Sequence, residues 1–231
     1  MEQPIDLLAR PVYGMGQVDR ILGLPAGTSR RWIDGYTRGS KFYLPIVRPE
    51  PTGDEIVTWG EFAEARHLAE FRDLGIRIRH LRVVVERLRS EFGELYPLAQ
   101  KRALLDVEGR EIVRNVQEVL HLDRDLRLVV VRNDQLVLGL RSQRFVDAVV
   151  FDDKGVPARI TPEPLFGRVF LDPVRQFGRP TVRSVPTEVI LEQYMAGDDP
   201  EMIAALYQLE LDLVHEAIRF ETYQMHQAEA A

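Results

Sequence analysis

The stretch "YGMGQVDRILGLPAGTSRRWIDGY", residues 13–36, decides the fold of the amino-terminal part of the chain. Apolar residues recur at helical spacing up to Leu22, and Gly23 is suited to end that helix. The turn "LPAG" follows, and a second short helix is expected to start by Thr28 and to run to about Asp34. Two short helices around a tight turn are typical of a DNA-reading helix-turn-helix, but also of an ordinary corner between packed helices.

Two adjacent arginines in the second helix bear on that choice. Arg30 and Arg31 lie about 100° apart around a helix, so one can face a phosphate while the other faces a base edge. Trp32 is then expected to turn inward against the first helix. In the alternative interpretation, both arginines are solvated side chains of a structural helix pair. Periodicity alone favours neither interpretation.

The residues that follow predict a wing and two longer helices. Residues 35–55 are rich in glycine, proline and aromatic side chains, which suits a small wing or loop. Thr58 and Glu61 fit a capping box, in which each side chain accepts the exposed backbone N–H of the other residue. A helix is expected from there to about Leu74, and a second one over about 79–92.

The middle of the chain has residue patterns typical of strands. The segment "LRLVVVRNDQLVLGL" predicts a hairpin whose turn lies at 132–135, and "RFVDAVVFDDKGVPARI" predicts two further strands. Residues 97–171 are therefore expected to form a β-rich middle module. From Asp172 onward the cap and proline signals indicate helices again. The predicted fold class is α+β.

Composition limits the compartment and the partners. The chain has 231 residues, no cysteine and a net charge of −6, so disulfides and thiolate chemistry are excluded. Net charge is 0 over residues 1–96, +1 over 97–171 and −7 over 172–231. If DNA is bound, the amino-terminal part is the better candidate, because phosphates attract a basic face. No apolar run approaches the roughly 18–20 residues that cross a bilayer, and the expected location is cytoplasmic, with no membrane partner.

The sequence offers no pattern for catalysis. None of the five histidines has metal-ligand spacing, and His67 and His80 are expected on helix surfaces. Nucleophile-elbow and phosphate-loop motifs are absent, and close acid pairs lie beside turn or cap signals. We therefore expect no enzyme activity, no metal site and no cofactor.

The opening stretch resembles the winged helix-turn-helix of MerR-type regulators. The residues that match are Tyr13, Val18, Leu22, Gly23, Arg30, Arg31 and Trp32. Lys41 and Tyr43 fall in the wing position, and "TWGEFAEARHLAEF" falls in the position of the third helix. Pro25 stands where that family usually has a hydroxyl-bearing cap residue. The resemblance implies a MerR-like DNA-binding domain at 1–96.

The carboxyl-terminal stretch resembles a small antitoxin-associated helix-turn-helix family. The matching residues are Asp172, Pro173, Gly178, Arg179, Pro180, Pro186, Gly197, Ile203, Tyr207, Ala217 and Ile218. The pair Arg183-Ser184 stands where Gly-Thr is usual. The resemblance implies an antitoxin-associated helical domain at 172–231.

Together the two ends resemble large VapB-type antitoxins, which are encoded beside PIN-domain ribonuclease toxins. The resemblance implies a protein that neutralises such a toxin and represses its own operon by binding operator DNA, as a homodimer. The residues expected to contact DNA are Thr28, Arg30, Arg31, Lys41 and Tyr43. Arg179 and Arg183 are candidates for contact with the toxin, because they interrupt an otherwise acidic domain.

Two other classes of protein stay open. One is a stand-alone MerR-like transcriptional regulator that senses a small ligand through its β-rich middle module. The other is an interaction adaptor without a role on DNA. Recovery of a nuclease with the chain would separate an antitoxin from the regulator. Operator binding that survives replacement of Arg30 and Arg31 by alanine would point to the adaptor, or would mean that the second motif reads the DNA.

Overall fold

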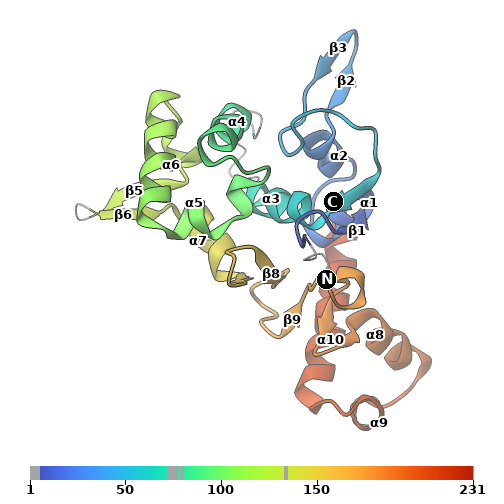
Figure 1. Cartoon of the computed structure of the whole chain (residues 1–231). Coiled ribbons are helices and arrows are strands. Elements are labelled where there is room, and N and C mark those ends of the chain that lie inside the picture. The colour runs from blue at the N-terminus through green and yellow to red at the C-terminus, as the bar shows by residue number, and fades with distance from the viewer. Residues whose placement is uncertain (1–5, 72–77, 79–80, 133–134, 231) are drawn as a thin grey trace, which may run out of the picture.

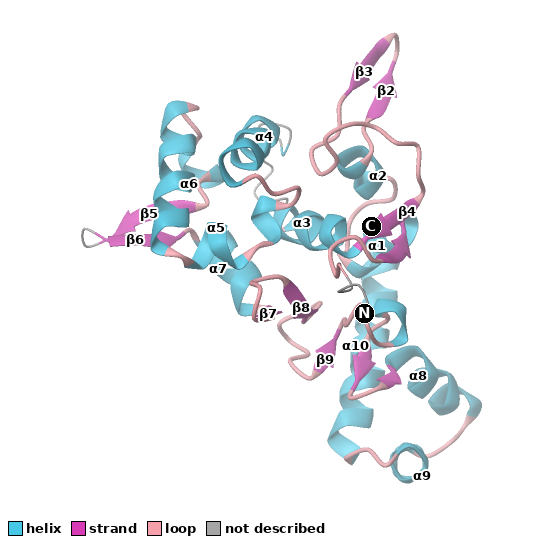
Figure 2. Ribbon diagram, viewed as in Figure 1, coloured by secondary structure: helices cyan, strands magenta, loops and turns pink. Residues whose placement is uncertain are grey.

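The computed structural model describes residues 6–71, 78, 81–132 and 135–230. Helices and small antiparallel sheets alternate along the chain (Figures 1 and 2), which confirms the α+β class. In this part of the chain the strands form several two-stranded pairs and one three-stranded sheet.

The opening stretch folds into two short helices and a wing. Strand β1, Pro11–Gly14, leads into α1, Met15–Ile21, and α2, Thr28–Ile33, follows after the turn. Strands β2, Tyr36–Arg38, and β3, Lys41–Tyr43, form the antiparallel wing, which projects from the rest of the molecule (Figure 1).

A central helix connects this unit to the rest of the chain. After β4, Ile56–Thr58, which pairs with β1, helix α3 runs over Trp59–Ala69 and α4 over Leu81–Phe92. The predicted capping box is confirmed, because the Glu61 N–H donates to the Thr58 hydroxyl at 3.3 Å and the Thr58 N–H donates to the Glu61 carboxylate at 2.8 Å. Helix α3 ends at Ala69, so the prediction that it runs to about Leu74 is wrong; Leu74 itself lies outside the described residues.

The middle module differs from its prediction. Helices α5, Lys101–Leu105, α6, Val107–Val119, and α7, Leu140–Asp147, occupy more of it than its strands, so "β-rich" is wrong. Helix α6 buries Val113 and Val116, which lie at helical spacing. The prediction rested on the two strand-like segments further along the chain and missed this helical pattern. The strands are β5, Val129–Arg132, β6, Gln135–Leu138, β7, Val149–Phe151, and β8, Pro157–Ile160. The expected hairpin of β5 and β6 is present.

The carboxyl-terminal part is a small sheet against three helices. Strands β9, Val169–Phe170, β10, Thr181–Val182, and β11, Val185–Pro186, form the sheet. Helices α8, Thr187–Ala196, α9, Pro200–Tyr207, and α10, Leu211–Ala230, follow. As predicted, α8 ends at Gly197, which takes a left-handed conformation with φ of 104°.

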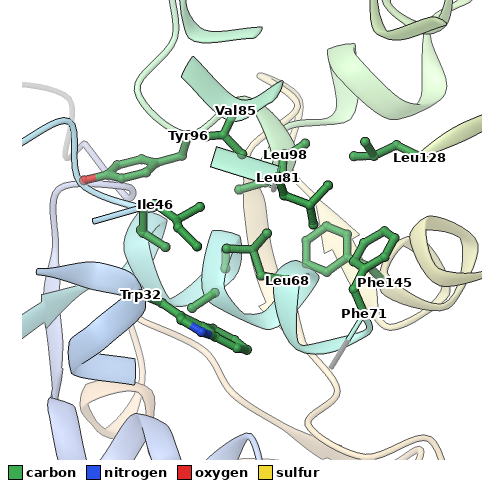
Figure 3. Close-up of a cluster of buried hydrophobic side chains, with 14 of the residues drawn as sticks. Trp32, Ile46, Leu68, Phe71, Leu81, Val85, Tyr96, Leu98, Leu128 and Phe145 are labelled. Atoms are coloured by element: carbon green, nitrogen blue, oxygen red, sulfur yellow. The ribbon is translucent and has the colours of Figure 1, made fainter. Parts of the chain in front are cut away.

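Two hydrophobic cores organise these elements. The larger core extends from Tyr13 to Leu171, so the first two predicted modules share it; Figure 3 shows Trp32, Leu68 and Phe145 among its side chains. The smaller core extends from Phe166 to Phe220. The division into three domains stays a prediction. Among the described residues, no helix is both long enough and apolar enough to cross a bilayer.

His67 lies inside the larger core, so its predicted surface position is wrong. Its Nδ1 is 2.9 Å from the Leu98 carbonyl, its Nε2 is 3.0 Å from the Ser142 hydroxyl, and its ring stacks on Phe145. Every residue of α3 from Trp59 to Leu68 is buried, so this helix has no solvent face on which a histidine can lie. His80 lies outside the described residues.

We expect His67 to make folding sensitive to acid. Burial lowers the pKa of His67 from 6.5 to about 4, so the unfolded chain takes up a proton before the folded chain does. The stability that neutral His67 supplies is complete above pH 6.5 and is lost as the pH falls toward 4, by about 3 kcal/mol in total. Urea titrations should show this extra loss in the wild type and not in His67→Gln. Equal losses in both proteins would contradict a neutral buried histidine.

Candidate nucleic-acid interface

A buried carboxylate fixes the turn between α1 and α2. Asp19 accepts the backbone N–H of Gly27 at 2.6 Å and that of Ser29 at 2.7 Å. The residue before α2 is Gly27, which has no side chain to cap the helix, so Asp19 of α1 satisfies the exposed N–H groups instead. The Ser29 hydroxyl donates to the Met15 carbonyl at 2.8 Å and ties the two helices together again.

Sequence reasoning missed Asp19. The absence of a hydroxyl at Pro25 left the cap of α2 unassigned, and the only signal was an acidic residue directly after the apolar Val18 of the first helix. A buried acid within an apolar face needs hydrogen-bond donors, and the nearest open donors are the N–H groups at the start of the next helix.

Replacing Asp19 with alanine should lower the free energy of unfolding by about 2 kcal/mol, because two N–H groups lose a charged acceptor. Asp19→Asn keeps one acceptor oxygen and should lose about half as much. Urea denaturation measures both variants. If Asp19→Ala unfolds at the same urea concentration as the wild type, the carboxylate does not hold the turn.

Helix α2 buries one face and exposes the other. Trp32 and Ile33 point into the core, and the Trp32 carbonyl accepts the N–H of Ile46 at 2.7 Å and that of Val47 at 2.9 Å. Arg30 and Arg31 are exposed. Trp32 therefore lies inward, as expected.

The two arginines have different surroundings. Arg30 forms an ion pair with Glu55, and both side chains are largely exposed. Arg31 donates from Nη2 to the Thr28 hydroxyl at 2.8 Å, so the buried Thr28 positions Arg31. Among the described residues no carboxylate pairs with Arg31, whereas Arg30 has Glu55 beside it.

The wing presents aromatic and basic side chains. Tyr36 pairs with Tyr43 across the hairpin and their rings stack at 4.8 Å. Arg38 pairs with Lys41, whose Nζ lies 5.3 Å from the centre of the Tyr43 ring. Phe42 is 45% exposed. Because the turn of the hairpin holds Arg38 opposite Lys41, the wing carries two cations at its tip.

An open groove of about 1120 Å³ lies between α2, the wing and the start of α4. Its cationic side chains are Arg31, Arg38, Lys41 and Arg82, and none of the described residues that line it is acidic. This groove, which we call the basic groove, is the place on the described surface where α2 and the wing present charge together.

The structure brings four of the five predicted DNA contacts to the basic groove. Thr28, Arg31, Lys41 and Tyr43 line it, whereas Arg30 lies outside it, beside Glu55. Sequence reasoning missed Arg38 and Arg82. The hairpin register was the available signal for Arg38, and only the fold brings Arg82 of α4 to α2.

A buried ion network holds the chain that returns from the wing. Arg48 is 5% exposed and lies 2.8 Å from Asp34 and 2.7 Å from Glu61. It also donates to the carbonyls of Asp54 and Ile56 at 3.0 and 2.9 Å.

In the same network, Arg48 balances the charge of Asp34 at the end of α2. Although burial alone raises the pKa of Asp34, the N–H groups of Thr52 and Gly53 and the Arg48 guanidinium lower it below its usual value. Asp34 therefore stays ionised, and its pairing with Arg48 ties the end of α2 to the cap of α3.

The candidate toxin contacts lie apart from this groove. Arg179 pairs with Glu188 at 2.6 Å and Arg183 pairs with Glu210 at 2.9 Å. All four side chains are at least half exposed. The structure places both arginines on the surface of the carboxyl-terminal part, each with its own carboxylate.

Comparisons with known proteins show similarity over most of the chain to proteins of Mycobacterium tuberculosis. No family model matches it. It is 36% identical over 222 residues to "Uncharacterized protein Rv2308" of Mycobacterium tuberculosis, covering 93% of this chain and 91% of that protein. It is 27% identical over 225 residues to "Putative antitoxin VapB45" of the same organism, covering 90% and 92%. The crystal structure of Rv2018 from Mycobacterium tuberculosis superposes with a TM-score of 0.72 at 25% identity, over 90% of this chain and 97% of that one.

Proposed function

We propose that this chain, which belongs to the family of the uncharacterized mycobacterial protein Rv2308, is the antitoxin of a toxin–antitoxin pair. The proposal rests on similarity over nearly the full length to a relative named as a VapB antitoxin, together with the resemblance of both ends of the chain to antitoxin modules.

The basic groove is the observation that supports the operator-binding part of the proposal. A helix that enters the major groove needs basic side chains for phosphates and base edges, and a wing beside it adds further backbone contacts. Helix α2 and the wing supply Arg31, Arg38 and Lys41 on one open surface. In this proposal the chain represses its own operon as a homodimer, because one short helix makes too few contacts for tight specific binding.

The acidic carboxyl-terminal part is proposed to bind the toxin, because its charge of −7 repels DNA phosphates. In this proposal the exposed Arg179 and Arg183 exchange their partners Glu188 and Glu210 for carboxylates of a PIN-domain ribonuclease. Catalytic activity then belongs to the toxin, and the chain acts without a cofactor.

Co-expression with the open reading frame beside its gene tests the antitoxin role. We expect a nuclease to copurify with the chain and to cleave RNA only after the chain is removed by denaturation and separate refolding. The variant Arg179→Gln/Arg183→Gln should retain less toxin, while Arg114→Gln on α6 should retain as much as the wild type. If no nuclease copurifies and no RNase activity is released, the chain is not an antitoxin of this kind.

A second candidate function is that of a ligand-sensing regulator. A cavity of about 850 Å³ borders the end of α1, the ends of α3 and α7, and α10. Its lining includes Leu22, next to the helix-turn-helix, and Glu163. A metabolite bound there would touch the elements that position α2. DNA binding that changes with a metabolite, in a chain that binds no nuclease, would favour this function.

A further inference from the structure

A second basic pocket lies at the junction of the two cores. It has a volume of about 420 Å³ and lies beside β8, β9, the turn between β10 and β11, and the start of α10. These elements meet at the lower centre of the molecule in Figure 1. Four arginines line the pocket, namely Arg159, Arg168, Arg175 and Arg183.

The pocket arginines keep hydrogen-bond donors available. Arg159 and Arg175 approach the same Asp172 oxygen through Nε, at 3.3 and 3.6 Å. The other Asp172 oxygen accepts the Val174 N–H at 2.9 Å. Each guanidinium offers five N–H donors, whereas the one carboxylate that Arg159 and Arg175 share has about four lone-pair sites, one of which accepts the Val174 N–H.

The charges that line the pocket do not balance. Against four guanidinium groups, the lining contains only the carboxylates of Asp172 and Glu210. Glu216 does not line the pocket and is bound to Arg168. Its carboxylate accepts hydrogen bonds from the Arg168 backbone N–H at 2.9 Å and from Nε at 2.6 Å. Arg159, Arg175 and Arg183 therefore surround the space with more positive than negative charge, although residues 172–231 carry −7 overall.

Backbone conformation fixes the position of Arg183. It occupies the two-residue turn between β10 and β11, with φ of 55°. Its Nη2 lies 2.9 Å from Glu210, just before α10. A non-glycine residue stays in the left-handed region only when the surrounding structure stabilises that backbone conformation.

We propose that this pocket binds a phosphoryl group, either of inorganic phosphate or of a mononucleotide. A phosphate carries up to two negative charges and several acceptor oxygens, which match convergent guanidinium forks better than a single carboxylate does. Phe170 and Leu213 supply apolar surface on the same lining, against which a nucleoside can lie. The volume is within the range of small-molecule sites, about 300–1,000 Å³.

Calorimetric titration of the purified chain alone, at low ionic strength, tests this inference independently of any toxin or operator. The probes are inorganic phosphate, AMP and adenosine. We expect phosphate and AMP to bind one per chain and adenosine not to bind. AMP affinity more than about tenfold above that of phosphate would identify a nucleotide as the source, and equal affinities would identify free phosphate.

The variant Arg175→Gln/Arg183→Gln should lower the affinity for both anions at least about tenfold, because two charge-assisted contacts are lost. The control is Arg219→Gln, which removes an exposed charge from α10 outside the pocket lining and should bind as the wild type does. Circular dichroism verifies that each variant is folded. No binding of phosphate or AMP up to about 10 mM, or the same loss in Arg219→Gln as in the pocket variant, overturns the proposal.

Discussion

Replacing Arg48 with methionine should lower the free energy of unfolding by about 3–5 kcal/mol. Methionine fills a similar length but leaves Asp34 and Glu61 as buried carboxylates without their cation. Removal of one partner from a buried ion pair costs far more than loss of a surface pair, because the remaining charge stays desolvated. The carbonyls of Asp54 and Ile56 lose their donor in the same variant.

Arg87→Met is the matched control for this substitution. Arg87 lies 2.6 Å from Glu91 on α4 and is 60% exposed, so its loss should cost less than about 1 kcal/mol. Urea denaturation of both variants measures the difference. Asp34→Asn/Glu61→Gln should restore part of the stability of Arg48→Met, because it removes the uncompensated charges. If Arg48→Met and Arg87→Met lower the free energy of unfolding by the same amount, the Arg48 network does not hold the chain that returns from the wing.

Removing three charges from the basic groove should nearly abolish specific DNA binding. We expect the triple variant Arg31→Gln/Arg38→Gln/Lys41→Gln to bind the DNA upstream of the gene about 100- to 1,000-fold more weakly, since a basic contact contributes about 1–3 kcal/mol. The slope of log affinity against log salt should also become less steep by about 3, because each phosphate contact adds close to one. Fluorescence anisotropy at several salt concentrations measures both quantities.

The control is the triple variant Arg114→Gln/Arg124→Gln/Arg132→Gln. It changes the net charge by the same amount, but its three positions lie in the middle module. It should shift the salt slope little. An equal loss of affinity in the two triple variants would mean that only the total charge of the chain matters, and that the groove is not the interface.

Local signals in the sequence predicted the elements whose contacts lie close along the chain. Thr58 and Glu61 are three residues apart, and their capping box forms as predicted. Strands β5 and β6 pair antiparallel, with Arg132 opposite Gln135, also as predicted. Such features depend on residue type and spacing alone.

Contacts between distant residues could not be predicted in this way. His67 meets Ser142 across 75 positions, and only the fold brings Arg82 of α4 to the basic groove, far along the chain from α2. Arg48 stands in "IVRPEPTGDE", a segment whose prolines and glycine predict a loop and give no sign of a buried arginine. For each of these residues, burial is decided by tertiary packing and not by local pattern.

Photocrosslinking to the operator duplex tests the DNA interface most directly. A benzophenone amino acid is placed at Phe42 in the basic groove, and in a second protein at Tyr194 on α8; the two positions are 45% and 44% exposed. An interface at the groove predicts crosslinks to DNA from position 42 and none from position 194. Crosslinks from position 194 alone would show that the acidic carboxyl-terminal part meets the DNA and would contradict the proposed interface.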